Sequence, residues 1–150
     1  MTGATNEIKI KRLRGEAGSP EFQPEKALIG LFLTGEGRND FTLAPGERFP
    51  LPTGIALELP EGIEGQITIS GPLAELSSIM LPNSPGTIDP DYRGEVFVIA
   101  QNTSGVPVTL RYGSHIADMR LRRFVQATFV QVDSLDESKR GNGGLGSTGV

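Results

Sequence analysis

Apolar and polar residues alternate with a period of two along most of this chain. Ile8 and Ile10 flank Lys9, and the stretches 55–59 and 67–69 repeat the alternation. This period is that of a β-strand, in which successive side chains point to opposite faces. Glycine and proline interrupt the pattern at intervals of roughly eight to twelve residues, a spacing typical of sandwiches and barrels. Further strands are expected at 78–81, 95–101, 106–111, 115–121 and 127–132. The predicted fold class is all-β.

One segment favours a helix. Leu73–Ser77 follows Pro72 and contains alanine, glutamate and leucine, which are residues that start or favour helices. No other segment keeps a helical period for more than about two turns. We therefore expect one short helix in a β fold.

The segment Leu28–Leu33 is the most apolar run of the chain, and two interpretations fit it. A run of this length is typical of a strand buried on both faces in a sandwich core. It also fits an exposed apolar surface used for assembly. The pattern alone leaves both open.

The C-terminus differs in composition from the rest of the chain. Five glycines lie between Gly141 and Gly149, and the residues from Ser138 onward cannot pack a core of their own. We therefore expect a β domain at residues 1–137 and a flexible glycine-rich arm at 138–150.

Composition narrows the possible functions. A chain of 150 residues forms one domain of ordinary size and can fold without disulfide bonds. It contains no cysteine and one histidine, so a bound metal would be a hard ion held by oxygens. The formal net charge is −4 and the basic residues are scattered, which argues against a nucleic-acid partner.

The sequence also argues against a membrane partner. No apolar run approaches the roughly 20 residues that span a bilayer, and the N-terminus lacks the apolar stretch of a secretory signal. We expect a cytoplasmic protein.

Two stretches carry the chemistry. Gly86–Glu95 (GTIDPDYRGE) places carboxylates in a tight turn, and Arg140–Gly149 (RGNGGLGSTG) combines glycines with one positive charge. Each is a weak signal alone, since aspartates in turns usually bond local N–H groups and glycine-rich tails are usually disordered. Their order and spacing in one short chain suit a bound nucleotide and an activated water.

These stretches, with Asn83–Pro85 before the turn, resemble those of a known family. The chain resembles the trimeric dUTP diphosphatases from residue 8 through the C-terminal arm, and 43–62 matches the family's early hairpins. The resemblance implies a β-sandwich or jelly-roll barrel of short strands that hydrolyses dUTP to dUMP and pyrophosphate. It also implies a homotrimer with its sites between subunits, where the arm of one protomer covers a pocket formed by two others.

The resemblance assigns roles within the turn. The uracil edge would be bound by the Asn83 side chain and by the backbone around Gly86, Thr87 and Ile88. A rigid edge of this kind rejects a base whose donors and acceptors differ. Tyr92 would lie under the deoxyribose, and Asp89 would contact the 3′-hydroxyl and act as general base toward the attacking water.

The arm would bind the phosphates. The resemblance implies this role for Arg140, Gly144, Gly146, Ser147 and Thr148. Glycines let backbone N–H groups approach phosphates closely, and the guanidinium and hydroxyls donate to them. Mg²⁺ would be held by the three phosphates and water, with no direct protein ligand.

Several positions depart from the family pattern, mainly on the triphosphate side. Gly30 stands in place of an aspartate near the metal's water shell, and Ser70–Pro72 in place of Arg-Ser-Gly. Asp118 replaces a phosphate-binding glutamine, Leu145 replaces the phenylalanine that caps the uracil, and Phe97 stands where relatives often have lysine. Each lost charge-assisted contact costs about 1.5 to 3 kcal/mol, so several losses together would weaken the enzyme strongly.

Two hypotheses of different classes follow. The first, favoured by the resemblance, is a dUTP diphosphatase, whether fully active or weakened. The second is a non-catalytic trimer of the same fold, of natural or engineered origin, that acts as a nucleotide-binding or assembly subunit. Higher-order assembly would follow if Leu28–Leu33 faced outward. His115 is expected on a strand surface or at an interface, without a catalytic role.

Overall fold

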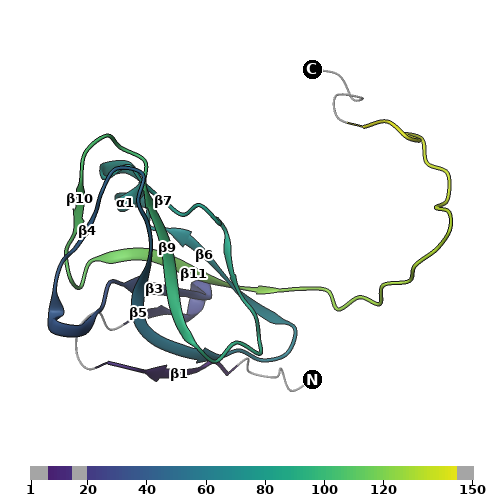
Figure 1. Ribbon diagram of the computed structural model, residues 1–150. Coiled ribbons are helices and arrows are strands. Elements are labelled where there is room, and N and C mark those ends of the chain that lie inside the picture. Colours follow the sequence, from purple (N-terminus) through teal and green to yellow (C-terminus); the bar gives the residue numbers. More distant parts are fainter. Residues whose placement is uncertain (1–6, 15–19, 145–150) are drawn as a thin grey trace.

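The computed structural model describes residues 7–14 and 20–144. Within these ranges the chain forms a β-sandwich from which the C-terminal segment projects (Figure 1). The strands are β1 (Lys9–Arg12), β2 (Glu21–Gln23), β3 (Leu28–Phe32), β4 (Phe41–Leu43), β5 (Arg48–Glu58), β6 (Ile63–Ile69), β7 (Ile79–Met80), β8 (Gly86–Ile88), β9 (Glu95–Asn102), β10 (Val108–Leu110) and β11 (His115–Arg123). The helical elements are α1 (Gly71–Leu76) and two 3₁₀ turns, η1 (Pro24–Lys26) and η2 (Glu36–Arg38).

Two antiparallel sheets form the body. One has the strand order β1-β5-β9-β7 and the other β2-β3-β11-β6-β8, while β4 and β10 form a separate pair. Alternate side chains of both sheets meet in one core, which contains Leu31 and Met119 from one sheet and Val96 and Val98 from the other. The predicted all-β sandwich is confirmed. Both large sheets are open in the part of the chain described, so it contains no closed barrel.

Strand β3 decides between the two interpretations of Leu28–Leu33. It lies between β2 and β11, and Leu31 and Leu33 are fully buried. The opposite sheet covers its inner face, and neighbouring strands cover both edges. The run is a core strand, and its interpretation as an exposed apolar surface is wrong, although Leu28 and Ile29 at its start also line the edge of a groove.

The other predicted elements are confirmed with one exception. The helix expected at Leu73–Ser77 begins two residues earlier, at Gly71, because Pro72 occupies its first turn. The strand expected at 127–132 is wrong, since residues 124–144 contain no strand and are exposed. A strand needs a neighbour for its backbone hydrogen bonds. No described strand of the body runs beside this segment, which leads away from the sandwich (Figure 1).

A buried amide fixes one end of β9. Asn102 has no exposed surface, and its nitrogen donates to the carbonyls of Leu43 at 3.0 Å and Val106 at 2.8 Å. Its oxygen accepts from the backbone N–H and the hydroxyl of Ser104 at 2.9 and 2.7 Å. Both donors of the amide and its oxygen are used, so β9 is tied to β4 and to the loop that follows β9.

A single carboxylate holds the other end of β9. Glu95 accepts both terminal guanidinium nitrogens of Arg14, Nη1 to Oε1 and Nη2 to Oε2, the latter at 2.8 Å, and the backbone N–H of Gly54 at 2.9 Å. Gly54 lies where the pairing of β5 with β9 shifts register, and its φ of 71° favours glycine. Burial by itself raises the pKa of Glu95, but the Arg14 and Gly54 donors outweigh it and hold that pKa below its usual value.

We expect Glu95→Gln to destabilise the fold by about 1–2 kcal/mol at neutral pH, because it removes the charge from a bidentate, half-buried pair. The folded-state pKa lies below the unfolded value. This contribution is therefore fully present above about pH 4.5 and is lost as pH falls through the folded-state pKa. Urea unfolding between pH 7 and pH 3 should show the stabilities of wild type and variant converging in acid.

Glu58→Gln is the matched control. Glu58 pairs with Lys9 at 2.8 Å on the exposed surface, so its replacement should change the free energy of unfolding little. Equal losses at Glu58 and Glu95 at pH 7 would contradict the role assigned to Glu95.

Candidate functional site

The turn at Gly86–Glu95 is stiffened by its own contacts. Strand β8 pairs with β6, and the chain then reverses and returns as β9. The backbone N–H of Tyr92 donates to the Asp89 carbonyl at 3.1 Å, and the Arg93 guanidinium donates to the Pro90 carbonyl at 2.6 Å. These bonds close the loop on itself, and they leave the Asp89 carboxylate exposed at its tip.

Asn83 lies against the start of β8. A Cβ built on Gly86 would be 3.3 Å from the Asn83 side-chain nitrogen, so glycine at this position lets the amide approach the strand. Gly86 itself is buried, Thr87 is exposed and Ile88 is half-buried. The amide and the β8 backbone are thus neighbours, and their shared role in binding a base stays a prediction.

Tyr92 lies over Gly94. The phenol donates to the Glu95 carbonyl at 2.7 Å, and a Cβ on Gly94 would lie 2.6 Å from the phenol oxygen. Tyr92 is 40% exposed, so its side chain lies at the surface, anchored through its hydroxyl, and is not part of the core. Because Asn83, Thr87, Asp89 and Tyr92 are all exposed, a ligand at this turn needs a cover from outside it.

Three of the positions expected to depart from the family pattern, Gly30, Ser70 and Asp118, come from three neighbouring strands or their ends. Asp118 in β11 pairs with Gly30 in β3 on one side and with Thr68 in β6 on the other. Ser70 follows β6, is 1% exposed, and donates its hydroxyl to the His115 carbonyl at 3.2 Å. The Ser70 hydroxyl is therefore engaged inside the protein.

Sequence reasoning missed one member of this group. His115, given no role, places its Nε2 2.9 Å from the Asp118 carboxylate. These residues are three apart, which in a regular strand would put them on opposite faces. A bulge in β11 places the two residues together. The bulge is visible in the register of the strands and leaves no signal in the sequence.

The described part of the arm, residues 138–144, does not approach the turn of its own chain (Figure 1). Strand β11 ends at Arg123, and the exposed segment beyond it leads away from the body (Figure 1). Arg140 donates to the carbonyl of Gly144 at 3.2 Å, which makes a local turn in the arm. The predicted phosphate-binding residues Gly146, Ser147 and Thr148, and Leu145 between them and Gly144, lie outside the described residues.

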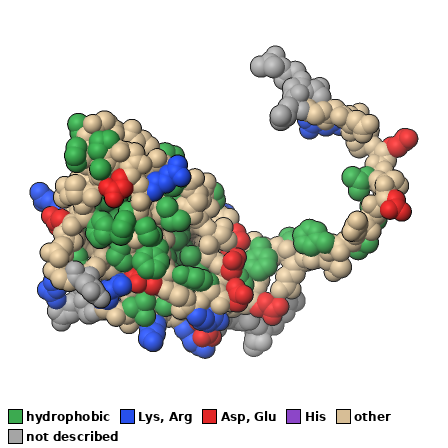
Figure 2. Space-filling model, in the orientation of Figure 1, with side chains coloured by type: hydrophobic (Ala, Val, Ile, Leu, Met, Phe, Trp, Pro, Cys, Tyr) green, Lys and Arg blue, Asp and Glu red, His purple; other side chains and the backbone are tan. Residues whose placement is uncertain are grey.

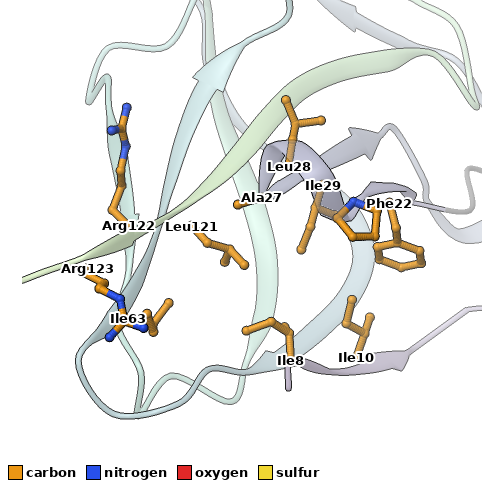
Figure 3. A pocket seen from close by; sticks show the side chains of 11 residues that line it. Ile8, Ile10, Phe22, Ala27, Leu28, Ile29, Ile63, Leu121, Arg122 and Arg123 are labelled. Carbon is orange, nitrogen blue, oxygen red and sulfur yellow. The ribbon is translucent and has the colours of Figure 1, made fainter. Parts of the chain in front are cut away.

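Apolar surface remains open on the body. A groove of about 730 Å³ lies at one end of the sandwich, where side chains of β1, β3, β6 and β11 converge (Figure 3). Its apolar lining includes Ile8, Ile10, Ile29, Ile63 and Leu121. Apolar side chains also gather over β5 and β9 (Figure 2), where Phe97 is 40% and Ile99 38% exposed.

The described residues include several of the side-chain types that bind metal ions in proteins. Among the residues that the structure describes, no three His, Cys, Asp or Glu side chains gather into a group that could hold a metal ion. In the same residues, no helix is long and apolar enough to cross a membrane.

Known proteins resemble this chain over nearly its whole length. A family model described as dUTPase matches residues 36–149. The deoxyuridine 5'-triphosphate nucleotidohydrolase of Anaeromyxobacter sp. (strain Fw109-5) is 43% identical over 145 residues, which cover 95% of this chain and 97% of that protein. The protein of the same name from Rickettsia felis is 40% identical over 145 residues, covering 96% and 97%.

Solved structures agree in fold. Staphylococcus bacteriophage 80alpha dUTPase with dUPNHPP has a TM-score of 0.83 at 22% identity, covering 97% of this chain and 100% of that chain. A mutant dUTPase from phage phi11 of S. aureus, reported to coordinate a structural Mg(II) ion, has a TM-score of 0.76 at 17% identity, covering 88% and 100%.

The contact between Gly94 and Tyr92 generates a prediction. Gly94→Ala should displace the phenol and break its hydrogen bond to Glu95, which costs about 1 kcal/mol of unfolding free energy and alters the tyrosine fluorescence. Gly105→Ala is the control, because a Cβ on Gly105 meets no atom within 4 Å. An unchanged phenol environment in Gly94→Ala would show that the ring is not held as described.

Proposed function

The chain belongs to the dUTPase family, and we propose that it hydrolyses dUTP to dUMP and pyrophosphate. The observation that carries this proposal is the stiffened turn, which presents the exposed Asp89 carboxylate together with Asn83 and the Tyr92 ring. In the reaction, water adds across the phosphoanhydride bond between the α and β phosphates. Asp89 takes the proton of the attacking water as general base.

The turn supplies recognition of the nucleoside. The Asn83 amide and the backbone of Gly86, Thr87 and Ile88 hydrogen-bond the uracil edge, supported by the 3.3 Å approach that glycine allows at position 86. Tyr92 carries the deoxyribose on its exposed face. Because the phenol is anchored to the Glu95 carbonyl, the ring holds its place when the sugar binds.

The arm and the metal act on the phosphates. Arg140, Gly144, Gly146, Ser147 and Thr148 donate to the triphosphate when the arm closes, and closure is coupled to the ligand because ordering the arm costs entropy. Mg²⁺ would bind together with the triphosphate, and we assign it no direct ligand from this chain. When bound, it would supply positive charge to the phosphates.

The altered phosphate-side positions point to weakened turnover. Gly30 offers no carboxylate, the Ser70 hydroxyl is bonded to the His115 carbonyl, and Asp118 is a carboxylate facing the side where phosphates bind. Each missing stabilising contact in the transition state can cost about 100-fold in rate. The base and sugar side of the site keeps all of its predicted residues.

We expect Asp89→Asn to lower kcat for dUTP by about 10² to 10⁴, the usual contribution of a general base. Pyrophosphate release with Mg²⁺ measures it, and Asp91→Asn, which removes a carboxylate from the same turn, should stay within about threefold of wild type. Wild-type turnover no faster than that of the Asp89 variant would favour a non-catalytic nucleotide-binding trimer instead.

The site is completed by a homotrimer, with each site between subunits. Support comes from two open surfaces of the single chain. The segment 124–135 exposes large apolar side chains, with Phe129 96% and Val125 89% exposed, and the groove beside β1 is lined by apolar side chains. Laying this segment of one copy against the groove of another buries both, and it also carries the following arm toward a neighbouring turn.

Phe129→Asp combined with Val130→Asp should therefore dissociate the trimer at micromolar concentration, because it places two charges in an apolar contact. Light scattering coupled to size exclusion measures the mass. Val106→Asp, at a loop valine that is 63% exposed, should leave the mass unchanged. If the double variant has the mass of the wild-type assembly, the proposed binding of this segment in the groove of a neighbouring copy is wrong.

A further inference from the structure

A bulge in β11 brings His115 and Asp118 onto one face. His115 pairs with Phe32 of β3, but the next pair is Ala117 with Leu31, so Ile116 is the extra residue. Ile116 and Ala117 are both fully buried, and the residues that flank this buried pair, His115 and Asp118, are the ones that reach the surface. His115 and Asp118 therefore share the outer face of the sheet, although they are three residues apart.

The imidazole is fixed on two sides. Its Nε2 lies 2.9 Å from the Asp118 carboxylate and 3.1 Å from the Ala117 carbonyl, and both are acceptors, so Nε2 carries the hydrogen. The ring also packs on Phe32, with centroids 5.1 Å apart. Nδ1 makes no hydrogen bond to any residue that the structure describes, and it is the nitrogen that gains a proton when the ring becomes charged.

The ring occupies space left by Gly30. Gly30 pairs with Asp118, and a Cβ on it would lie 3.5 Å from His115 Nε2 and 3.4 Å from both the Phe32 ring and the Glu21 Cβ. Among the residues that the structure describes, the charged groups that strand register places closest to the imidazole are Asp118 on its own strand and Glu21 on β2, which pairs with Gly30. The neighbouring positions on β3 and β6, Gly30, Phe32 and Thr68, carry no charge.

We propose that the protonated His115 binds the triphosphate of dUTP, with Asp118 holding the ring in place. This rests on the proposed function, which places the phosphates beside positions 30, 70 and 118. With the ring neutral, the pair carries the Asp118 charge and repels phosphates. With the ring protonated, the pair is neutral and Nδ1–H is a charge-assisted donor. His115 supplies a cation on a side where the chain has lost family contacts.

The single histidine gives a direct test, because its ring protons are the only imidazole signals in the NMR spectrum. Their titration is followed from pH 5.5 to 8.5 in the free protein, with dUMP, and with the imido analogue dUpNHpp. A ligand that binds the protonated ring about tenfold more tightly raises the titration midpoint by about one pH unit. We expect this rise with dUpNHpp and little change with dUMP.

Binding to variants separates the ring from other titrating groups. The Kd for dUpNHpp is compared between wild type and His115→Gln at each pH, so that titration of the ligand's own phosphate cancels. The wild-type advantage should grow about tenfold from pH 8 to pH 6. Asp118→Asn should tighten binding at pH 8, because it removes the repelling charge and keeps an acceptor for Nε2–H.

The outcomes distinguish this proposal from the proposed function. The role of His115 alone is overturned if the protein hydrolyses dUTP, dUpNHpp leaves the midpoint of the histidine titration unchanged, and the ratio of wild-type to variant Kd stays constant with pH. A raised midpoint with dUpNHpp in a protein that does not turn over dUTP supports the role of His115 and contradicts the enzymatic function. Failure to bind either nucleotide, with no change in the histidine signals, overturns both.

Discussion

The burial of the Glu95 carboxylate is the constraint on which the rest of this structure depends. A charge at the start of a core strand is tolerated only if donors replace its water, and here the Arg14 guanidinium and the Gly54 N–H do so. The same residue offers its carbonyl to the Tyr92 hydroxyl. One position therefore joins the segment that follows β1, the register shift of β5, the start of β9 and the turn that carries Asp89. The geometry of the candidate site follows from how the sandwich buries this group.

The body of a single chain is complete as a fold but leaves the candidate site open. Its core is closed by side chains that are nearly all excluded from solvent, whereas the turn residues, the groove beside β1 and the segment after β11 remain open. Burying apolar surface is the main driving force for association. The surfaces that a lone chain leaves exposed are those that copies of it would cover. In the proposed trimer, ligand binding and assembly would be linked, because the chain that covers the turn also carries the arm that we propose binds the phosphates.

Prediction from sequence worked where the relevant contacts are local. The period-two pattern placed most strands, and proline and short-range propensity placed α1 within two residues. The residues of the motif at 83–95 lie close together in the structure because a tight turn holds its own residues together, and their roles stay predictions. The strand expected at 127–132 was wrong for the opposite reason: alternation shows that a segment can pair, but not whether a partner strand lies beside it.

By itself, the sequence determined the fold class, the core strand at Leu28–Leu33 as one of two interpretations, the family and the chemical content of the turn. Only the tertiary structure decided that this run is buried, that the Ser70 hydroxyl is engaged by the His115 carbonyl, and that Glu95 is neutralised by residues far away in the chain. It also decided that His115 and Asp118 share a face, because one bulged residue reverses the side-chain alternation on which the sequence pattern relies. Strand register is set by packing between distant segments, and a pattern read along one segment does not contain it.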